Sequence, residues 1–202
     1  MAGNIVRIGV LSLQGDFDKH IKALTRAGAD ARLVRTPEEI ADIDGLIIPG
    51  GESTTVGILL EKTGCGDSIL KRAAERMPIY GTCTGMILMA NSIEEGRPDQ
   101  YRLNLLDISV RRNAYGRQID SFEAYIDIPS LSIESFHAIF IRAPQVTRVG
   151  GNVKILSVHN NIPVLLKQDN FLVSSFHPEL TEDVRLHKYF IRLVAENCQC
   201  PI

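Results

Sequence analysis

The sequence has no long apolar stretch and few cysteines. None of its hydrophobic runs approaches the roughly 18–20 residues that a helix needs to cross a bilayer, so we expect no membrane partner. Four cysteines in 202 residues are too few for a disulfide scaffold. The N-terminal region shows no secretory pattern, because Gln14, Asp16 and Asp18 follow only a short apolar run. These features predict a reducing, cytoplasmic setting.

A strong net charge and the common nucleotide and metal motifs are also missing. A net charge of -2 creates no field that would favour nucleic acid or an anionic membrane as a partner. There is no P-loop motif, and no G-x-G-x-x-G motif follows the first apolar run, so nucleotide binding is not predicted. Cys198 and Cys200 lack the spacing and the second ligand pair of a zinc site, and we expect no metal or cofactor.

The sequence does contain the composition and the rhythm of an α/β protein. Hydrophobic residues make up 45% of the chain and charged residues 23%, which is ordinary for a globular domain with a sizeable core. Strands alternate with helices in the first half, which predicts a parallel sheet covered on both faces. We therefore expect one domain, 1–202, with a three-layer, open, mixed but mostly parallel sheet. Strands are expected at 6–13, 31–34, 45–48, 78–82, 107–112, 122–128, 136–142, 153–158, 163–168 and 171–176, and helices at 16–27, 53–61, 65–76 and 183–197, with a capping box at 36–39.

A single cysteine stands between two glycines directly after an apolar strand, in Gly81-Thr82-Cys83-Thr84-Gly85. The same pattern with serine is the nucleophile elbow, a sharp strand-to-helix turn that exposes the reactive side chain. The alternative is a buried structural cysteine, since free cysteine is among the most buried residue types. The pentapeptide alone does not decide between the two.

Four polar or glycine-rich segments follow predicted strands, and their convergence favours catalysis. They are 13–15, 49–53, the elbow and 176–179. Open α/β sheets bind ligands outside the carboxyl ends of their strands. A cysteine nucleophile needs a base and an orienting carboxylate, which His177 and Glu179 would supply. The peptide N–H groups at Gly51 and Thr84 would suit a developing oxyanion.

The remaining histidines are weaker candidates for chemistry. His20 and His187 fall within helical patterns, and we expect both on exposed helix faces. His137 and His159 lie at strand edges, where a structural role is expected.

Three segments together resemble class I, triad-type glutamine amidotransferases: the cysteine elbow, Pro-Gly-Gly-Glu-Ser-Thr at 49–54 and His-Pro-Glu at 177–179. Further blocks narrow the resemblance to the glutaminase subunits of pyridoxal 5′-phosphate synthase. Where these subunits usually carry a smaller residue such as alanine, this chain has Thr84. The further blocks are 13–15, 112–118, 120–123, 140–144 and 175–183, and they span essentially the whole chain in the family's order.

The resemblance implies a flavodoxin-like fold and a cofactor-free reaction. Cys83, His177 and Glu179 would be the catalytic triad that hydrolyses L-glutamine to L-glutamate and ammonia through a glutamyl thioester. The ammonia would pass to a separate, barrel-shaped synthase subunit, which would also activate the glutaminase. The resemblance assigns glutamine binding to Gly51, Glu52, Ser53, Arg112, Ile141 and Arg142, and the oxyanion hole to Gly51 and Thr84.

Three other interpretations remain. A glutaminase subunit of an imidazole or purine pathway would share the triad but not the block at 112–118. A stand-alone cysteine hydrolase or peptidase would not need the 52–54 loop. A non-catalytic regulatory or scaffold subunit would not need Cys83, His177 and Glu179 intact.

Overall fold

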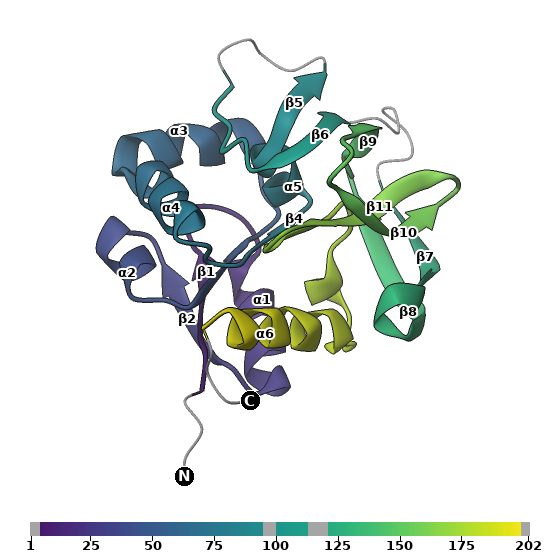
Figure 1. Ribbon diagram of the computed structural model, residues 1–202, viewed down its shortest axis with the longest axis horizontal. Coiled ribbons are helices and arrows are strands. Elements are labelled where there is room, and N and C mark those ends of the chain that lie inside the picture. The colour runs from purple at the N-terminus through teal and green to yellow at the C-terminus, as the bar shows by residue number, and fades with distance from the viewer. Residues whose placement is uncertain (1–4, 95–99, 113–120, 199–202) are drawn as a thin grey trace.

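A seven-stranded sheet forms the centre of the computed structural model, which describes residues 5–94, 100–112 and 121–198 (Figure 1). Its strand order is β10-β11-β12-β4-β3-β1-β2. The strands from β2 to β12 pair in parallel, whereas β11 and β10 add an antiparallel edge. The strands are β1 (Arg7–Leu11), β2 (Asp30–Val34), β3 (Gly45–Ile48), β4 (Ile79–Thr82), β10 (Lys154–His159), β11 (Ile162–Gln168) and β12 (Phe171–Ser174).

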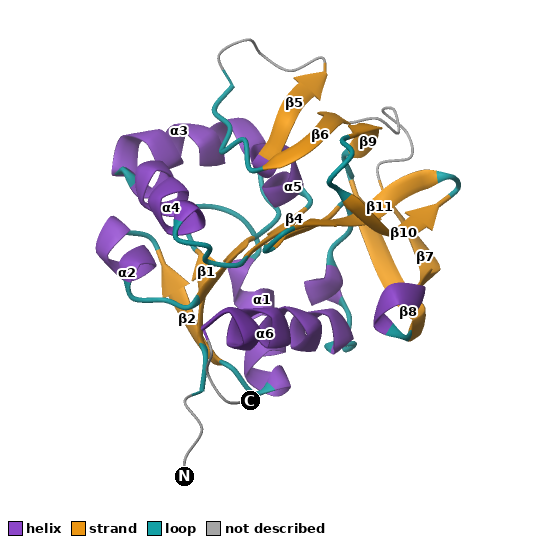
Figure 2. Ribbon diagram, in the orientation of Figure 1, coloured by secondary structure: helices purple, strands orange, loops and turns teal. Residues whose placement is uncertain are grey.

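Helices cover both faces of this sheet (Figure 2), as predicted. Side chains of successive strand residues point to opposite faces, so Leu46 and Ile48 join one apolar cluster and Ile47 joins the other. The two clusters are the two cores of a three-layer protein. One is capped by α2 (Pro37–Ala41), α3 (Ser53–Thr63), α4 (Cys65–Ala74) and α5 (Thr84–Met89), and the other by α1 (Phe17–Ala27) and α6 (Arg185–Cys198).

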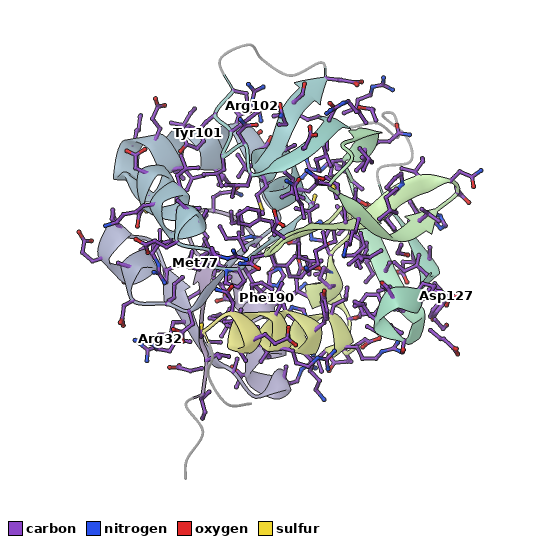
Figure 3. All side chains as sticks on the ribbon, viewed as in Figure 1. Arg32, Met77, Tyr101, Arg102, Asp127 and Phe190 are labelled. Carbon is purple, nitrogen blue, oxygen red and sulfur yellow. The ribbon has the colours of Figure 1, made fainter. Side chains whose placement is uncertain are left out.

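Several helix boundaries follow the local signals in the sequence. Helix α1 ends at Gly28, whose φ of 97° is the left-handed conformation that glycine adopts without strain. At α2 the predicted capping box is complete, because Thr36 and Glu39 each accept a hydrogen bond from the other's backbone N–H. Helix α6 packs through Phe190, which is fully buried against Tyr80 of β4 and is labelled in Figure 3.

Two smaller sheets extend the core at one side of the molecule. Strand β6 (Leu106–Arg111) pairs with β5 (Ala90–Glu94) and β9 (Gln145–Val149). Strands β7 (Ser121–Ile128) and β8 (Ile133–Ile141) form a hairpin around a short 3-10 turn, η1 (Pro129–Leu131). The sequence did not predict β5 or β9, because both are short and rich in polar residues. No helix among the described residues is long and apolar enough to cross a membrane.

Candidate active site

The four segments that were predicted to converge follow four strands that are neighbours in the sheet. These strands, β12, β4, β3 and β1, lie side by side and run parallel. Their carboxyl ends therefore share one edge, the position at which open α/β sheets bind ligands. The candidate catalytic side chains come from this edge, and residues at the ends of β6 and β8 complete the cavity in front of them.

Cys83 occupies the sharp turn between β4 and α5. Its φ of 48° and ψ of -99° are a conformation that a residue with a Cβ adopts only under strain. The flanking glycines make the turn possible, since a Cβ on Gly81 would lie 2.6 Å from the carbonyl carbon of Gly85. A Cβ on Gly85 would collide with the carbonyl oxygen of Ile48. The elbow geometry is thus a consequence of the Gly-x-Cys-x-Gly pattern.

His177 lies between Cys83 and Glu179. Its Nδ1 is 2.7 Å from Oε1 of Glu179, on the 3-10 turn η2 (Pro178–Leu180), so Nε2 is left to face Cys83. The Sγ of Cys83 is also 3.7 Å from the carbonyl oxygen of Ile141, at the end of β8. Gly50 lies flat against the His177 ring, where any Cβ would overlap Cε1. The imidazole is therefore held from three sides.

His177 and Glu179 each shift the pKa of the other toward the charged form. Burial alone would lower the pKa of His177, but its hydrogen bonds to Cys83 and Glu179 outweigh burial and raise that pKa to about 10. Burial likewise tends to raise the pKa of Glu179, yet His20 and His177 bring it down to about 2. Near neutral pH the pair is therefore an imidazolium beside a carboxylate.

A cavity of about 310 Å³ opens in front of Cys83 and His177. Every residue that the family resemblance assigned to glutamine binding or to the oxyanion hole lines it. Glu179 does not, because it lies behind His177 and is buried. Ile87 adds an apolar wall that the sequence analysis did not identify, although it lies in the apolar run after the elbow. The lining consists of Gly51, Glu52, Ser53, Cys83, Thr84, Ile87, Arg112, Ile141, Arg142 and His177.

Two oppositely charged side chains meet at one side of this cavity. Nη2 of Arg112 donates to Oε1 of Glu52 at 3.2 Å, and its Nη1 donates to Oε1 of Gln100 at 2.7 Å. The Glu52 carboxylate also caps α3 by accepting from the backbone N–H groups of Thr54 and Thr55. Partial burial tends to raise the pKa of Glu52, but these hydrogen bonds lower it to about 2. This side of the cavity thus pairs a carboxylate with a guanidinium.

The prediction for two of the histidines was wrong. His20 and His187 are fully buried rather than exposed. Each lies on the sheet-facing side of its helix, the two rings contact each other, and His20 also contacts Glu179. The spacing contained this signal, because His20 is three residues after Phe17 and four before Leu24 on the apolar face of α1.

Of the other two histidines, His159 lies at the end of a strand, as predicted, whereas His137 lies in the middle of β8. His137 is 2.6 Å from a carboxylate oxygen of Glu123 across the β7–β8 hairpin. His159, the last residue of the edge strand β10, stacks on Phe122 and Phe140.

Some sequence features lie outside the described residues. These are the family block beyond Arg112, at 113–118, together with Asp120 and Cys200. Among the residues that the structure describes, no group of three or more His, Cys, Asp or Glu side chains is arranged to hold a metal ion.

A mostly parallel α/β sheet with a cysteine elbow at its carboxyl edge is the arrangement expected of a class I glutamine amidotransferase. The chain belongs to the SNO glutamine amidotransferase family, whose profile matches residues 10–196. It is 46% identical to "Pyridoxal 5'-phosphate synthase subunit PdxT" of Thermotoga petrophila, over 94% of this chain and 100% of that protein. It is 50% identical to the protein of the same name from Salinispora arenicola, over 93% of this chain and 96% of the relative.

Solved structures agree with this assignment. A crystal structure described as a glutamine amidotransferase matches with a TM-score of 0.88 and 48% identity, over 93% of this chain and 98% of the other. A putative GMP synthase subunit from Thermoplasma acidophilum matches with a TM-score of 0.68 at 15% identity, over 97% of each chain. At that identity the similarity shows the fold alone.

Proposed function

We propose that this chain is the glutaminase subunit of a pyridoxal 5′-phosphate synthase, and that Cys83, His177 and Glu179 are its catalytic triad. The observation that carries the proposal is the strained elbow cysteine that lines one cavity with His177, whose ring is hydrogen-bonded to buried Glu179. The family match over 10–196 supports a single glutaminase domain across residues 1–202. The names of the relatives support the choice of pathway.

In the acylation step, Sγ of Cys83 attacks the side-chain carbonyl carbon of L-glutamine. The raised pKa of His177 favours the imidazolium, which is the partner that a thiolate nucleophile requires. The C–N bond then breaks as His177 Nε2–H gives its proton to the departing nitrogen, which leaves as ammonia. The products of this step are a glutamyl thioester on Cys83 and a neutral His177.

In the deacylation step, neutral His177 acts as the base. It takes a proton from a water molecule, whose oxygen attacks the thioester carbonyl, and the C–S bond breaks to release L-glutamate. Glu179 stays ionised throughout, since its pKa is about 2, and stabilises each imidazolium that forms. No metal or cofactor is needed for either step.

The oxyanion of each tetrahedral intermediate needs donors close to Cys83. Thr84 is the first residue of α5, so its N–H has no acceptor within the helix. We assign this N–H and that of Gly51 to the oxyanion hole, because both residues line the cavity.

The charged pair Glu52–Arg112 suits the zwitterionic end of glutamine. An α-ammonium would be held by Glu52 and an α-carboxylate by Arg112, so the substrate would exchange one ion pair for two. Ser53, Arg142 and the backbone of Ile141 complete the lining around the substrate.

The macromolecular partner would be a barrel-shaped synthase subunit, to which the ammonia produced here would pass. We infer a cytoplasmic setting, which the free thiols of Cys65 and Cys83 support. A glutaminase of an imidazole or purine pathway is the alternative. It is not favoured, since the putative GMP synthase subunit that shares the fold is only 15% identical to this chain.

Glutamate release from glutamine tests the proposal. The purified chain should release glutamate, and Cys83→Ala should lower kcat by on the order of 10⁴-fold or more while the fold is retained. The matched control is Cys65→Ser, where a hydroxyl can replace the thiol that donates to the Arg35 carbonyl. Near-normal turnover by Cys83→Ala would overturn the mechanism, and stimulation by the synthase subunit distinguishes this pathway from the alternatives.

A further inference from the structure

Two further histidines lie next to each other behind the carboxylate of Glu179. His20 comes from α1 and His187 from α6, and both side chains are fully buried. Nδ1 of His20 is 3.1 Å from Nε2 of His187, and Nε2 of His20 is 3.3 Å from Oε2 of Glu179. The glutaminase mechanism above does not use either ring.

Glu179 has two carboxylate oxygens with different surroundings. Oε1 is 2.7 Å from Nδ1 of His177, whereas buried Oε2 has no hydrogen-bond partner among the described residues. A buried carboxylate oxygen without a donor is unfavourable. The nearest nitrogen that could provide one is Nε2 of His20, which also lies 3.2 Å from the hydroxyl oxygen of Thr82.

Both histidines are neutral near neutral pH. Burial lowers the pKa of His20, and burial together with the nearby His20 lowers that of His187 to about 3. A neutral imidazole has one N–H donor and one lone-pair acceptor. Each ring can therefore take part in the cluster in only one of two tautomers. The charged or titratable groups around the pair are Glu179, His177, Asp16, Arg26 and Asp183.

Only one combination of tautomers avoids both a lone pair facing Glu179 and a buried N–H without an acceptor. If His20 donated from Nδ1, its Nε2 lone pair would face the Glu179 carboxylate and repel it. His187 would then carry a buried Nδ1–H without an acceptor among the described residues, which is rare in native proteins. In the opposite arrangement Nε2–H of His187 donates to Nδ1 of His20, and Nε2–H of His20 points toward Oγ1 of Thr82 at 3.2 Å and Oε2 of Glu179 at 3.3 Å.

We propose that His20 is a positioning residue for the triad, and that His187 fixes the tautomer of His20 so that its N–H is always presented to Oε2 of Glu179. This proposal rests on the proposed glutaminase function. Glu179 is thereby held between two imidazoles, with Oε1 available only to His177. The orientation of His177 toward Cys83 then depends on residues from α1 and α6, on the sheet face opposite α5.

The direct test is the tautomer of each ring in the wild-type protein. Nitrogen-15 NMR of histidine-labelled protein at neutral pH should show both His20 and His187 as neutral Nε2–H tautomers. An Nδ1–H tautomer or a charged ring at His20 would overturn the proposal. This readout does not depend on activity, so a chain without glutaminase activity would refute the proposed function and leave this result interpretable.

Two substitutions of His20 separate positioning from packing. His20→Leu removes the donor and should lower glutaminase kcat by roughly 10- to 100-fold, the range for losing a hydrogen bond to a charged group, with little change in KM. His20→Gln can place an amide N–H near the position of Nε2 and should recover most of that loss. Folded His20→Leu with unchanged kcat would overturn the proposal, as would equal losses in the two variants. If His20→Leu does not fold, the proposal is tested by the kcat of His20→Gln relative to wild type and by the tautomers seen by NMR.

Discussion

The hydroxyl of Thr84 donates a hydrogen bond of 2.5 Å to the carbonyl oxygen of Gly51. Thr84 follows the nucleophile, and Gly51 belongs to the loop after β3, so this contact joins the two proposed halves of the oxyanion hole. The peptide group between Gly51 and Glu52 is also held at its N–H, which donates to Oε1 of Gln14 at 2.7 Å. A smaller residue such as alanine at position 84 could not make the first of these contacts.

Removing the Thr84 hydroxyl should therefore loosen the loop. We expect Thr84→Val, which keeps the shape of the side chain, to lose about 0.5–1.5 kcal/mol of unfolding free energy. Its kcat should fall by roughly 3- to 30-fold, less than the roughly 100- to 1000-fold cost of losing an oxyanion donor. Thr84→Ser keeps the hydroxyl and is the control. Urea denaturation and glutaminase assays measure both effects, and equal behaviour of the two variants would contradict the prediction.

The backbone strain at Cys83 predicts an unusual order of stability. At most positions glycine is less stable than alanine by about 0.4–1 kcal/mol, because it gains more freedom in the unfolded chain. With a φ of 48° the order should reverse, since glycine adopts this conformation without strain. Cys83→Gly should thus be at least as stable as Cys83→Ala in urea denaturation. A clear advantage for alanine would show that the turn is unstrained.

A substrate analogue should react with Cys83 and with no other cysteine of the chain. A diazo-ketone analogue of glutamine should label Cys83, which lines the cavity, and spare Cys65, Cys198 and Cys200. Mass mapping of the adduct measures this. An adduct on any other cysteine would count against the proposed nucleophile.

Acid should destabilise the protein through the buried histidine pair. The pKa of His187 falls from an ordinary 6.5 to about 3, and that of His20 is also lowered. As pH falls below 6.5 the unfolded chain binds protons that the folded chain does not, so the free energy of unfolding decreases. Glu179 and Glu52, whose pKa values fall from 4.5 to about 2, add to this loss chiefly below about pH 5.5, so the interval from pH 6.5 to 5.5 reports mainly on the histidines.

Urea denaturation across that interval measures the effect. Each excluded proton contributes up to about 1.4 kcal/mol per pH unit. His187→Gln removes one titrating ring and should flatten the slope. His159→Gln, at the end of β10, removes a histidine outside the cluster and is the control. An unchanged slope in His187→Gln would contradict the assignment.

Substrate choice should follow the Glu52–Arg112 pair. Asparagine is one methylene shorter than glutamine, so with its α-groups held there its amide would not reach Cys83, and kcat/KM should favour glutamine strongly. Arg112→Ala should raise the KM for glutamine about 10-fold or more. Arg148→Ala, which breaks an exposed ion pair with Asp107, is the matched control. Comparable kcat/KM values for glutamine and asparagine would refute this arrangement.

Activation by the synthase subunit should act on the peptide between Gly50 and Gly51. The peptide between Gly51 and Glu52 is held at both its C=O and its N–H. Among the described residues, by contrast, the Gly50 carbonyl accepts a single, long hydrogen bond of 3.4 Å, from the N–H of Asp16. Rotation there would turn the Gly51 N–H into the oxyanion position, so partner binding should raise kcat by roughly 100- to 1000-fold. Assays with and without the synthase subunit measure this. Full activity of the isolated chain would rule out such control.

Local patterns were enough to predict most of the fold. The alternation of strands and helices, the capping box at α2 and the glycine after α1 depend on neighbours within a few residues, and the structure confirms them. Strands β5 and β9 were missed because their stability comes from pairing with β6 rather than from their own composition. The elbow was predictable because its two glycines act within five residues of each other.

The sequence by itself determined which groups could do chemistry and at which strand ends they lie, since the order of a parallel sheet brings those ends to one edge. Only the tertiary structure decided what surrounds them. Thr84 meets Gly51, and His20 meets Glu179 and His187, across separations of 33 to 167 residues. Such contacts depend on how α1 and α6 rotate against the sheet, which no local propensity specifies. For that reason two histidines predicted to be exposed instead lie buried behind the proposed triad.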